Sequence, residues 1–456
     1  MKYRLWVLLT FIVLCGGSTD QDYCERDENG SCKSKTNSEQ CEDEDEPCFI
    51  EEKVAKKEEN AYPHFETLSR LNPGKIGSEQ TYTIGGREMK LITRALKPLL
   101  FEIPNALNDE EILHVIEKAK NPNYSGGMFS SQARGGLTPE DTFKPSKEPG
   151  RASGPASRFD NWDFNDDQII DLKEVAMFCR NYNFLYFKEP EVKTMIETLK
   201  LNEFDDGICT VDEFQNMNTQ GIEDYLNQVM RDHPKFRQRY SDQVWLPMAK
   251  EYDKLLSKIR YRFGELLKIP EKILLGSEHL QVVRYLPQGH YHAHHDSETE
   301  KVTDKPCCHH TSTKTVLQYN KCKLCRFITV MVYLNTPEEG GETAFPAADN
   351  ITYSDSSFRR RGTEAIDLFN LSEHCQDANL VLKPVKGTAV VWYNHYVDYK
   401  GWLGALEERS LHGGCEVKKG EKWIMNIWIT APYKNSVNKL SMYSMEYAMS
   451  AAHNKD

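Results

Sequence analysis

Two histidines and one carboxylate in this sequence could hold a single metal ion. His294 and Asp296 lie two residues apart in a segment that reads as extended, so both side chains project from the same face of a strand. His412 lies in a segment that reads as strand, turn and strand, and it could supply the third ligand. Two imidazoles and one carboxylate leave three positions of an octahedral ion open, as in non-haem Fe(II) oxygenases. A lone His-x-Asp is a weak signal, because three neighbouring histidines offer other ligands.

A lysine after His412 strengthens this interpretation. Lys422, Ile424, Asn426 and Trp428 alternate onto one face of the last expected strand. A lysine that faces a barrel interior needs an anion. A dicarboxylate that chelates the metal through one end would supply that anion at its other end.

Short β-branched and aromatic runs, separated by turn residues, fill the chain between residue 267 and Pro432. In the run 326–334, Thr329 and Tyr333 share the face that could line a cavity, and further strands are expected near 340–346 and 387–394. A strand is also expected over 89–102. Helices are expected over 108–120, with Asn108 as the cap, and over 244–267. Many short strands with few helices predict a barrel or jelly roll.

Two acidic loops between residues 159 and 215 have the spacing of calcium sites. The first loop places Asp163, Asn165, Asp167, Ile169, Asp171 and Glu174 at the six ligand positions of an EF-hand. Gln168 stands where such loops carry glycine, which requires a left-handed residue and reduces the expected affinity. The second loop offers Asn202, Asp206, Ile208, Thr210 and Glu213. Phe204 falls where an oxygen ligand belongs, so the second loop either binds calcium weakly or only supports the first.

The combination of His294-x-Asp296, GGETAFP at 340–346, His412 and Lys422 resembles the 2-oxoglutarate and Fe(II)-dependent prolyl 4-hydroxylases, over about residues 88–122 and 240–432. The resemblance implies that 2-oxoglutarate chelates Fe(II) and that Lys422 holds its C5 carboxylate. It also implies use of O2 and ascorbate, release of succinate and CO2, and a proline-containing protein substrate. The EF-hand loops narrow the resemblance to the transmembrane branch of this family, which is found in the endoplasmic reticulum.

The resemblance also implies roles for residues around the metal. Tyr285, Thr329 and Tyr333 match positions that flank the cosubstrate in relatives, Trp428 matches an aromatic position on the last strand, and Tyr291 matches a wall residue. Core packing is the alternative for these side chains.

An α+β fold and five parts follow from these patterns. We expect a double-stranded β-helix (jelly roll) dioxygenase domain with supporting helices over 87–124 and 236–436, and a helical EF-hand pair inserted at 125–235. A signal peptide is expected at 1–17, an acidic cysteine-rich segment at 18–86 and a tail at 437–456.

The N-terminus and composition suggest a compartment. Lys2 and Arg4 precede an apolar run too short to span a bilayer, which predicts a cleaved signal, a lumenal or secreted protein and no membrane attachment. Net charge is −12 and no basic patch suggests nucleic-acid binding. Of 13 cysteines, twelve follow the signal, and with sequons at Asn29, Asn123, Asn350 and Asn370 they favour disulfides and glycosylation. Zinc held by Cys307, Cys308, Cys322 and Cys325 is the less favoured alternative, and Cys375 and Cys415 are expected to be structural.

Three hypotheses about function remain open from the sequence. The first is a prolyl 4-hydroxylase, for which modulation by calcium and a homodimer are further hypotheses. The second is a lumenal calcium-binding protein that has lost catalysis, although no ligand of the triad is substituted. The third is a hydroxylase of lysine or another side chain, which the pocket motif does not separate from the first.

Overall fold

The computed structural model describes residues 67–131, 150–248, 253–298, 307–308, 323–354 and 367–431. The expected signal peptide, most of the acidic cysteine-rich segment and the C-terminal tail lie outside these ranges. Among the helices that are described, none is both long and apolar enough to cross a membrane.

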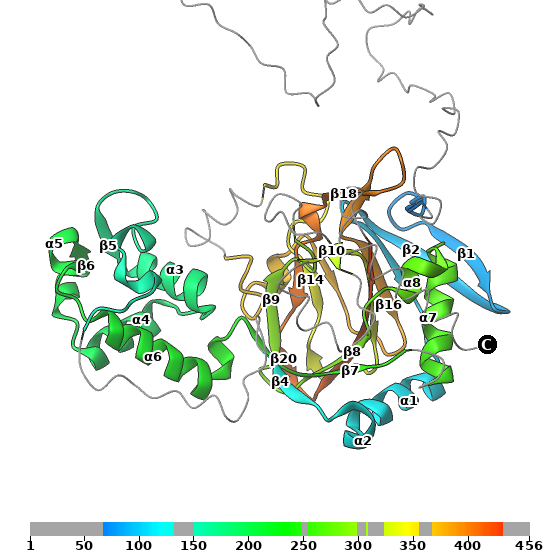
Figure 1. The fold of residues 1–456 in the computed structure, drawn as a ribbon, viewed down its shortest axis with the longest axis horizontal. Helices are drawn as coiled ribbons and strands as arrows, with labels where there is room; N and C mark the ends of the chain where they lie inside the picture. Colours follow the sequence, from blue (N-terminus) through cyan, green and yellow to red (C-terminus); the bar gives the residue numbers. More distant parts are fainter. Residues whose placement is uncertain are drawn as a thin grey trace, which may run out of the picture. The chain divides into compact units, whose positions relative to one another are not determined.

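A large antiparallel sheet forms the body of the molecule (Figure 1). One row of strands consists of β1 (Glu79–Ile84), β2 (Arg87–Leu96), β3 (Leu99–Ile103), β16 (Ala389–Tyr393), β12 (Arg326–Tyr333), β21 (Lys422–Thr430), β8 (Leu280–Tyr285) and β7 (Arg239–Leu246). The order continues through β9 (His290–His294), β19 (His412–Gly414), β14 (Thr343–Phe345) and β15 (Leu380–Leu382), while β4 (Phe129–Ser131) pairs with β7.

The strands on either side of β7 in this order face each other across a shared core. Strand β7 joins them, because it pairs with β8 along most of its length and with β9 at its start. The hydroxyl of Tyr333 on β12 donates to Thr343 Oγ1 on β14 at 2.8 Å, and Phe345 packs edge-on against Trp392. The antiparallel sheet therefore closes around an interior, as the expected jelly roll requires.

The helical expectations near the sheet are partly correct. Helix α1 (Asp109–Lys120) begins after Asn108, whose side chain accepts from the Glu111 amide in a capping box, as predicted. The helix expected over 244–267 is wrong in its first part: residues up to Leu246 form β7, and α7 spans only Lys254–Leu266. The run expected as one strand at 89–102 is a hairpin of β2 and β3. In β7, pairing with β8 outweighs the local helical pattern.

The remaining elements are short. Beside the sheet lie α2 (Pro122–Ser125), α8 (Glu271–Leu275), η7 (Cys375–Asp377), η8 (Glu408–Ser410), and the strand pairs β10 (Cys307–Cys308) with β11 (Lys323–Leu324), β13 (Glu339–Gly340) with β20 (Val417–Lys419), and β17 (His395–Val397) with β18 (Leu403–Leu406).

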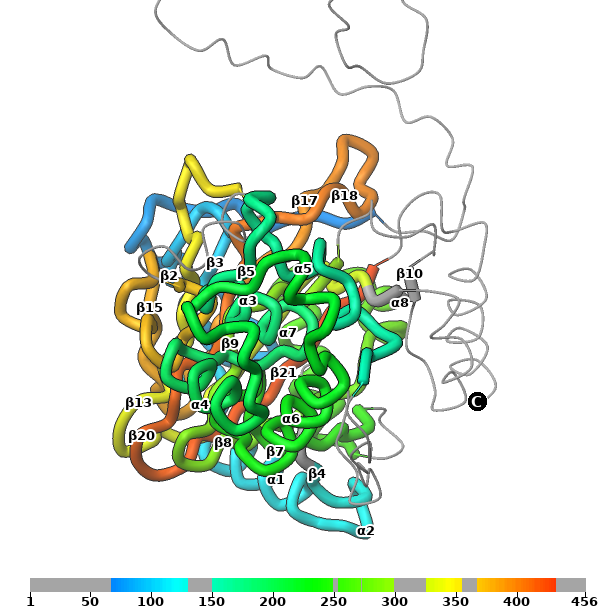
Figure 2. The backbone as a smooth tube through the Cα atoms, turned by 90° about the vertical axis from the view of Figure 1, so that its left-hand side faces the viewer, coloured from blue at the N-terminus to red at the C-terminus, as the bar shows by residue number. Residues whose placement is uncertain are grey.

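The inserted segment has a core of its own. It contains η1 (Pro155–Ser157), η2 (Phe159–Asn161), β5 (Ile169–Asp171), α3 (Leu172–Asn183), α4 (Glu189–Leu199), η3 (Asn202–Phe204), β6 (Ile208–Thr210), α5 (Val211–Phe214), α6 (Thr219–Asp232) and η4 (Pro234–Phe236). Helices α3, α4 and α6 pack together (Figure 2), with Trp162 stacked on Phe178 at 3.6 Å between ring centroids. The chain leaves the sheet after β4 and returns at β7, which are antiparallel neighbours with Ser131 opposite Ser241.

Candidate metal centre

The structure brings the three predicted metal ligands together from separate segments. His294 ends β9, Asp296 follows it, and His412 begins β19, the neighbouring strand, directly opposite His294. His294 Nε2 lies 3.7 Å from Asp296 Oδ1, and His412 Nε2 lies 3.6 Å from Asp296 Oδ2. One ligand atom from each residue lies within 4.8 Å of the other two, which suits a single ion.

Backbone carbonyls hold both imidazoles in the orientation that a metal needs. His294 Nδ1 lies 2.9 Å from the carbonyl oxygen of His292, and His412 Nδ1 lies 2.8 Å from that of Ser410. Because each Nδ1 must carry the proton to make these bonds, each Nε2 presents its lone pair to the centre. Burial lowers the pKa of His412 to about 4, so this imidazole stays neutral and able to bind metal at neutral pH.

Asp296 is kept ionised and is fixed by donors from two strands. Thr329 Oγ1 donates to Asp296 Oδ2 at 2.7 Å, and Trp428 Nε1 donates to the same oxygen at 3.1 Å. Burial would raise the pKa of this carboxyl, but His412, His294 and Arg326 together hold it far below its usual range. The carboxylate is therefore available as an anionic ligand.

Arg326 supports the centre and was not recognised from the sequence. It is partly buried, pairs with Glu278 through bonds of 2.6 and 2.9 Å, and lies over the Trp428 ring at 3.5 Å from the centroid. Its Nη1 reaches the Asp296 backbone carbonyl at 3.3 Å. An arginine at the start of a strand carries no local signal of this role, since Glu278 is distant in the sequence.

A cavity of about 250 Å³ opens beside the three ligands, and Lys422 lies in its wall. Lys422 is 1% exposed, and its Nζ lies 5.5 Å from the ring centroids of Tyr285 and Tyr333. It forms no ion pair with any described residue, and burial lowers its pKa to about 7. Gly341 leaves room for it, because a Cβ at this position would lie 3.2 Å from Lys422 Cδ. A buried, unpaired ammonium in a cavity is a site for an anion.

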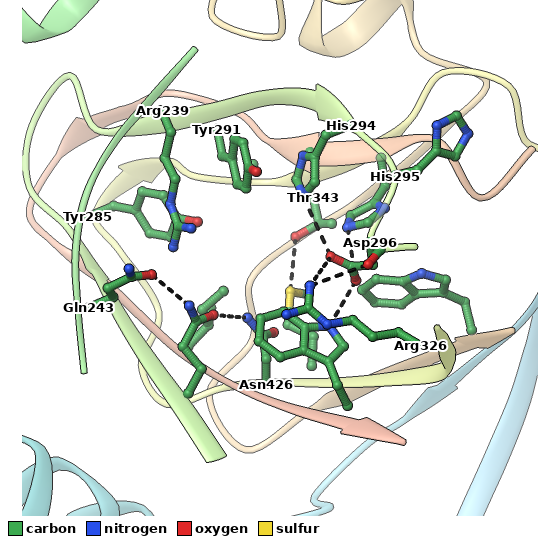
Figure 3. Close-up of a pocket in the computed structure, with 18 of the residues that line it drawn as sticks. Arg239, Gln243, Tyr285, Tyr291, His294, His295, Asp296, Arg326, Thr343 and Asn426 are labelled. Atoms are coloured by element: carbon green, nitrogen blue, oxygen red, sulfur yellow. Dashed lines mark hydrogen bonds and ion pairs between the residues drawn. The ribbon is translucent and has the colours of Figure 1, made fainter. Parts of the chain in front are cut away.

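The other predicted site residues surround the same cavity (Figure 3). Tyr285 and Trp428 line it, and Tyr291 stacks on the His294 ring at 3.5 Å between centroids. Thr329 contributes to the site through its hydrogen bond to Asp296. The hydroxyl of Tyr333 donates a hydrogen bond to Thr343.

Four further lining residues were missed in the sequence. They are Arg239, Gln243, Trp245 and Gln281. The first three lie on β7, part of which the sequence pattern predicted as helix, and all of them reach the cavity only through strand pairing.

Strand β9 also borders a second, smaller cavity beside the inserted segment. His292 lines this cavity together with Tyr186, which follows α3, and their rings lie 3.9 Å apart. Arg180 on α3 pairs with Asp367 at 2.7 Å, and the Gln238 amide donates to the Phe184 carbonyl. The inserted segment thus contacts the residue two positions before His294.

The first acidic loop has the predicted side chains turned inward. Asp163 accepts backbone amides of Asp167 and Gln168, and Glu174 accepts those of Phe164 and Asn165. Gln168 is left-handed at φ 68°, as its position required. Glu174 is buried, which raises its pKa.

The second acidic loop differs from the first in the side chains at its ligand positions. β6 pairs with β5, but Phe204 is buried in the helical core at the position where a ligand was missing. Glu213 is bound to the amide and hydroxyl of Thr210. Asn202 lies in η3, and Asp206 accepts from the Ile208 amide.

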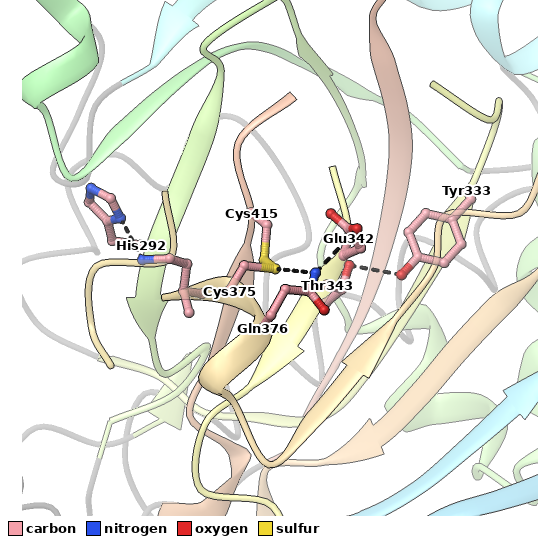
Figure 4. The surroundings of a disulfide bond; sticks show 8 residues. His292, Tyr333, Glu342, Thr343, Cys375, Gln376 and Cys415 are labelled. Atoms are coloured by element: carbon pink, nitrogen blue, oxygen red, sulfur yellow. Dashed lines mark hydrogen bonds between the residues drawn. A yellow bond between two sulfur atoms is a disulfide. The ribbon is translucent and has the colours of Figure 1, made fainter. Parts of the chain in front are cut away.

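The cysteines do not all follow the predicted pattern. Cys375 and Cys415 form a disulfide that ties η7 to the chain just after His412 (Figure 4). Cys325 is also disulfide-bonded, which argues against its use in a zinc site. Cys179 and Cys209 are free and buried in the core of the inserted segment, so the disulfides that the cysteine count favoured do not include these two.

Known proteins resemble this chain in sequence over most of its length. The 2OG-Fe(II) oxygenase superfamily matches residues 280–430. Transmembrane prolyl 4-hydroxylases of Mus musculus and Homo sapiens are each 35% identical over 368 residues, which is 80% of this chain and 70% of the relative. A probable prolyl 4-hydroxylase of Arabidopsis thaliana is 31% identical over 40% of this chain and 51% of its own.

Solved structures of prolyl hydroxylases are among the matches. A viral collagen prolyl hydroxylase from Paramecium bursaria Chlorella virus-1 is 26% identical over 46% of this chain and 88% of its own, with a TM-score of 0.26.

These relatives correct one prediction and establish the family. The two mammalian relatives are named transmembrane prolyl 4-hydroxylases, so the prediction of a lumenal or secreted protein is wrong. They also answer the question of catalysis, because relatives of this similarity are named as hydroxylases. The chain belongs to the prolyl 4-hydroxylases and is a 2-oxoglutarate and Fe(II)-dependent dioxygenase.

Proposed function

We propose that this chain hydroxylates proline at C4 in a protein substrate, with His294, Asp296 and His412 as the ligands of Fe(II). The observation that carries the proposal is the meeting of this triad and the unpaired Lys422 in one cavity. Bound Fe(II) and 2-oxoglutarate supply, with O2, the oxidising power for C–H hydroxylation and release succinate and CO2. Ascorbate keeps the iron reduced.

The chain's own residues orient the reactants. The carbonyls of His292 and Ser410 aim the two imidazoles, and Thr329 and Trp428 hold the carboxylate. Lys422 binds the C5 carboxylate of 2-oxoglutarate, with Tyr285 beside it. Lys422 and Tyr285 are buried, which strengthens the charge interaction at this end of the cavity.

The first test is succinate release by the purified chain from 2-oxoglutarate in the presence of Fe(II), ascorbate and a panel of proline peptides, including a collagen-like Pro-Pro-Gly repeat. Replacement of an outer residue of a metal site typically costs about 10- to 100-fold, so loss of a ligand in His412→Ala should cost more than about 100-fold. The same change at His233, which is exposed on the inserted segment, is the control. Activity that survives His412→Ala would overturn the assignment of ligands.

We infer further that the first acidic loop binds calcium through Asp163, Asn165, Asp167, the Ile169 carbonyl, Asp171 and Glu174. The support is the buried carboxylate of Glu174, which has no cationic partner among the described residues and whose pKa burial raises. The second loop, with Asn202, Asp206, Ile208, Thr210 and Glu213, serves mainly to support the first through the β5–β6 pair.

Thermal unfolding with calcium and with chelator tests this inference. Calcium should raise the unfolding temperature of the wild type and of Glu213→Gln, whereas Glu174→Gln should abolish the shift. Equal unfolding temperatures of the wild type with calcium and with chelator would count against a calcium site.

A further inference from the structure

Three side-chain amides form a hydrogen-bonded row across neighbouring strands in the wall of the cavity. Asn426 Nδ2 on β21 donates to Gln281 Oε1 on β8 at 3.0 Å, and Gln281 Nε2 donates to Gln243 Oε1 on β7 at 2.6 Å. Gln243 and Asn426 lie at the two ends of this row in Figure 3. Asn426 and Gln281 are 9% and 3% exposed, whereas Gln243 is half-buried.

All bonds in the row run in one direction, toward Gln243. A primary amide has one carbonyl oxygen and two N–H donors. Gln243 uses its oxygen to accept from Gln281, and its Nε2 makes no hydrogen bond within the described part of the chain. Its donors are therefore left for a molecule in the cavity, while the two more deeply buried amides fix which way it faces.

The surroundings of Gln243 suit a peptide better than the cosubstrate. The carboxylates of 2-oxoglutarate are matched by cations, namely the metal and Lys422, whereas the Gln243 amide is neutral. Trp245, on the same face of β7, lies 5.5 Å from Trp428 between ring centroids and offers an apolar surface. A prolyl residue has no backbone N–H, so its main chain can only accept hydrogen bonds. A site that recognises it must supply donors.

We propose that Gln243, held by Gln281 and Asn426, donates a hydrogen bond to a main-chain carbonyl of the peptide at or beside the target proline. This role rests on the proposed prolyl hydroxylation. Gln243 contacts the substrate, and Asn426 is a positioning residue that acts through Gln281.

Two substitutions remove the N–H donor that Gln243 offers to the peptide but keep a row of hydrogen-bonding side chains at these three positions. In Gln243→Glu, a carboxylate oxygen still accepts from Gln281, but no N–H remains for the peptide. In Asn426→Asp, the donor at the start of the row is lost, so Gln281 turns to donate to the introduced carboxylate, and Gln243 turns its oxygen toward the cavity. Both changes therefore present an acceptor to the peptide carbonyl.

The experiment measures KM for the peptide, KM for 2-oxoglutarate, and succinate released without peptide, using the best peptide of the panel. Each variant should raise the peptide KM about tenfold, the effect of losing one hydrogen bond and gaining a repulsion. The 2-oxoglutarate KM should rise by less than the peptide KM, and the succinate released without peptide shows how far each variant disturbs the cosubstrate site. Gln215→Glu, at an exposed position of the inserted segment, is the control for the chemical change.

Two outcomes would overturn the inference. They are an unchanged peptide KM in Gln243→Glu, or a raised KM for 2-oxoglutarate in its place. If Asn426→Asp does not fold, Gln243→Glu decides alone, since its side chain is half-buried and keeps its bond to Gln281. Wild-type protein that releases succinate but hydroxylates no proline peptide would instead refute the proposed function.

Discussion

At the scale of single residues, Lys422 should make cosubstrate binding depend on pH. Its pKa is lowered to about 7 by burial, so the free enzyme carries the ammonium below that pH and loses it above. A dicarboxylate needs the ammonium, so kcat/KM for 2-oxoglutarate should fall as pH rises through about 7, approaching tenfold per pH unit. Lys422→Arg, which stays charged, should flatten this fall even if it weakens binding. A fall of the same shape in Lys422→Arg would assign it to another group.

The sequence predicted some residues of the site and missed others. His294 and Asp296 were found because their spacing places them on one face of a strand, and Lys422 because it alternates with apolar and polar residues onto one face of the last strand. His412 was a candidate that the family resemblance supported. Arg326 and the row of amides were not found, because their partners lie on strands that only the register of the folded sheet brings together.

At the scale of elements, the Cys375–Cys415 disulfide should stabilise the strand that carries His412. It closes a loop with a sequence separation of 40, for which the chain-entropy estimate is about 4 kcal/mol. The double change Cys375→Ser and Cys415→Ser should lower the free energy of unfolding by about that amount, measured by urea denaturation. An unchanged midpoint would mean that packing alone holds β19 in place.

Elements were predicted well where pattern and pairing agree. The α1 capping box and the alternating strand β12 are examples. β7 was misassigned in part because its apolar positions also fit a helix, and only its pairing with β8 and β9 decides. The ligand positions of the second acidic loop could be assigned by counting back from Glu213. The burial of Phe204 shows that its position in this loop packs into the hydrophobic core.

At the scale of the whole molecule, calcium in the inserted segment should affect the peptide KM through Tyr186. This residue follows α3, the helix that starts at the first acidic loop, and its ring packs at a tilt against the ring of His292. Tyr186→Phe keeps the ring and should keep the effect of calcium on peptide KM, whereas Tyr186→Ala should lose it. Both variants should retain the calcium-dependent rise in unfolding temperature, because the loop itself is unchanged. A calcium effect that persists in Tyr186→Ala would point to another route.

The pairing of β4 with β7 has a consequence for the history of the molecule. Ser131 and Ser241 are neighbours across the sheet, although more than a hundred residues separate them along the chain. The inserted segment therefore occupies the place of a hairpin turn. An ancestor could have acquired or lost it in a single genetic event without displacing a strand, and relatives with a plain turn at this place would still build the same oxygenase.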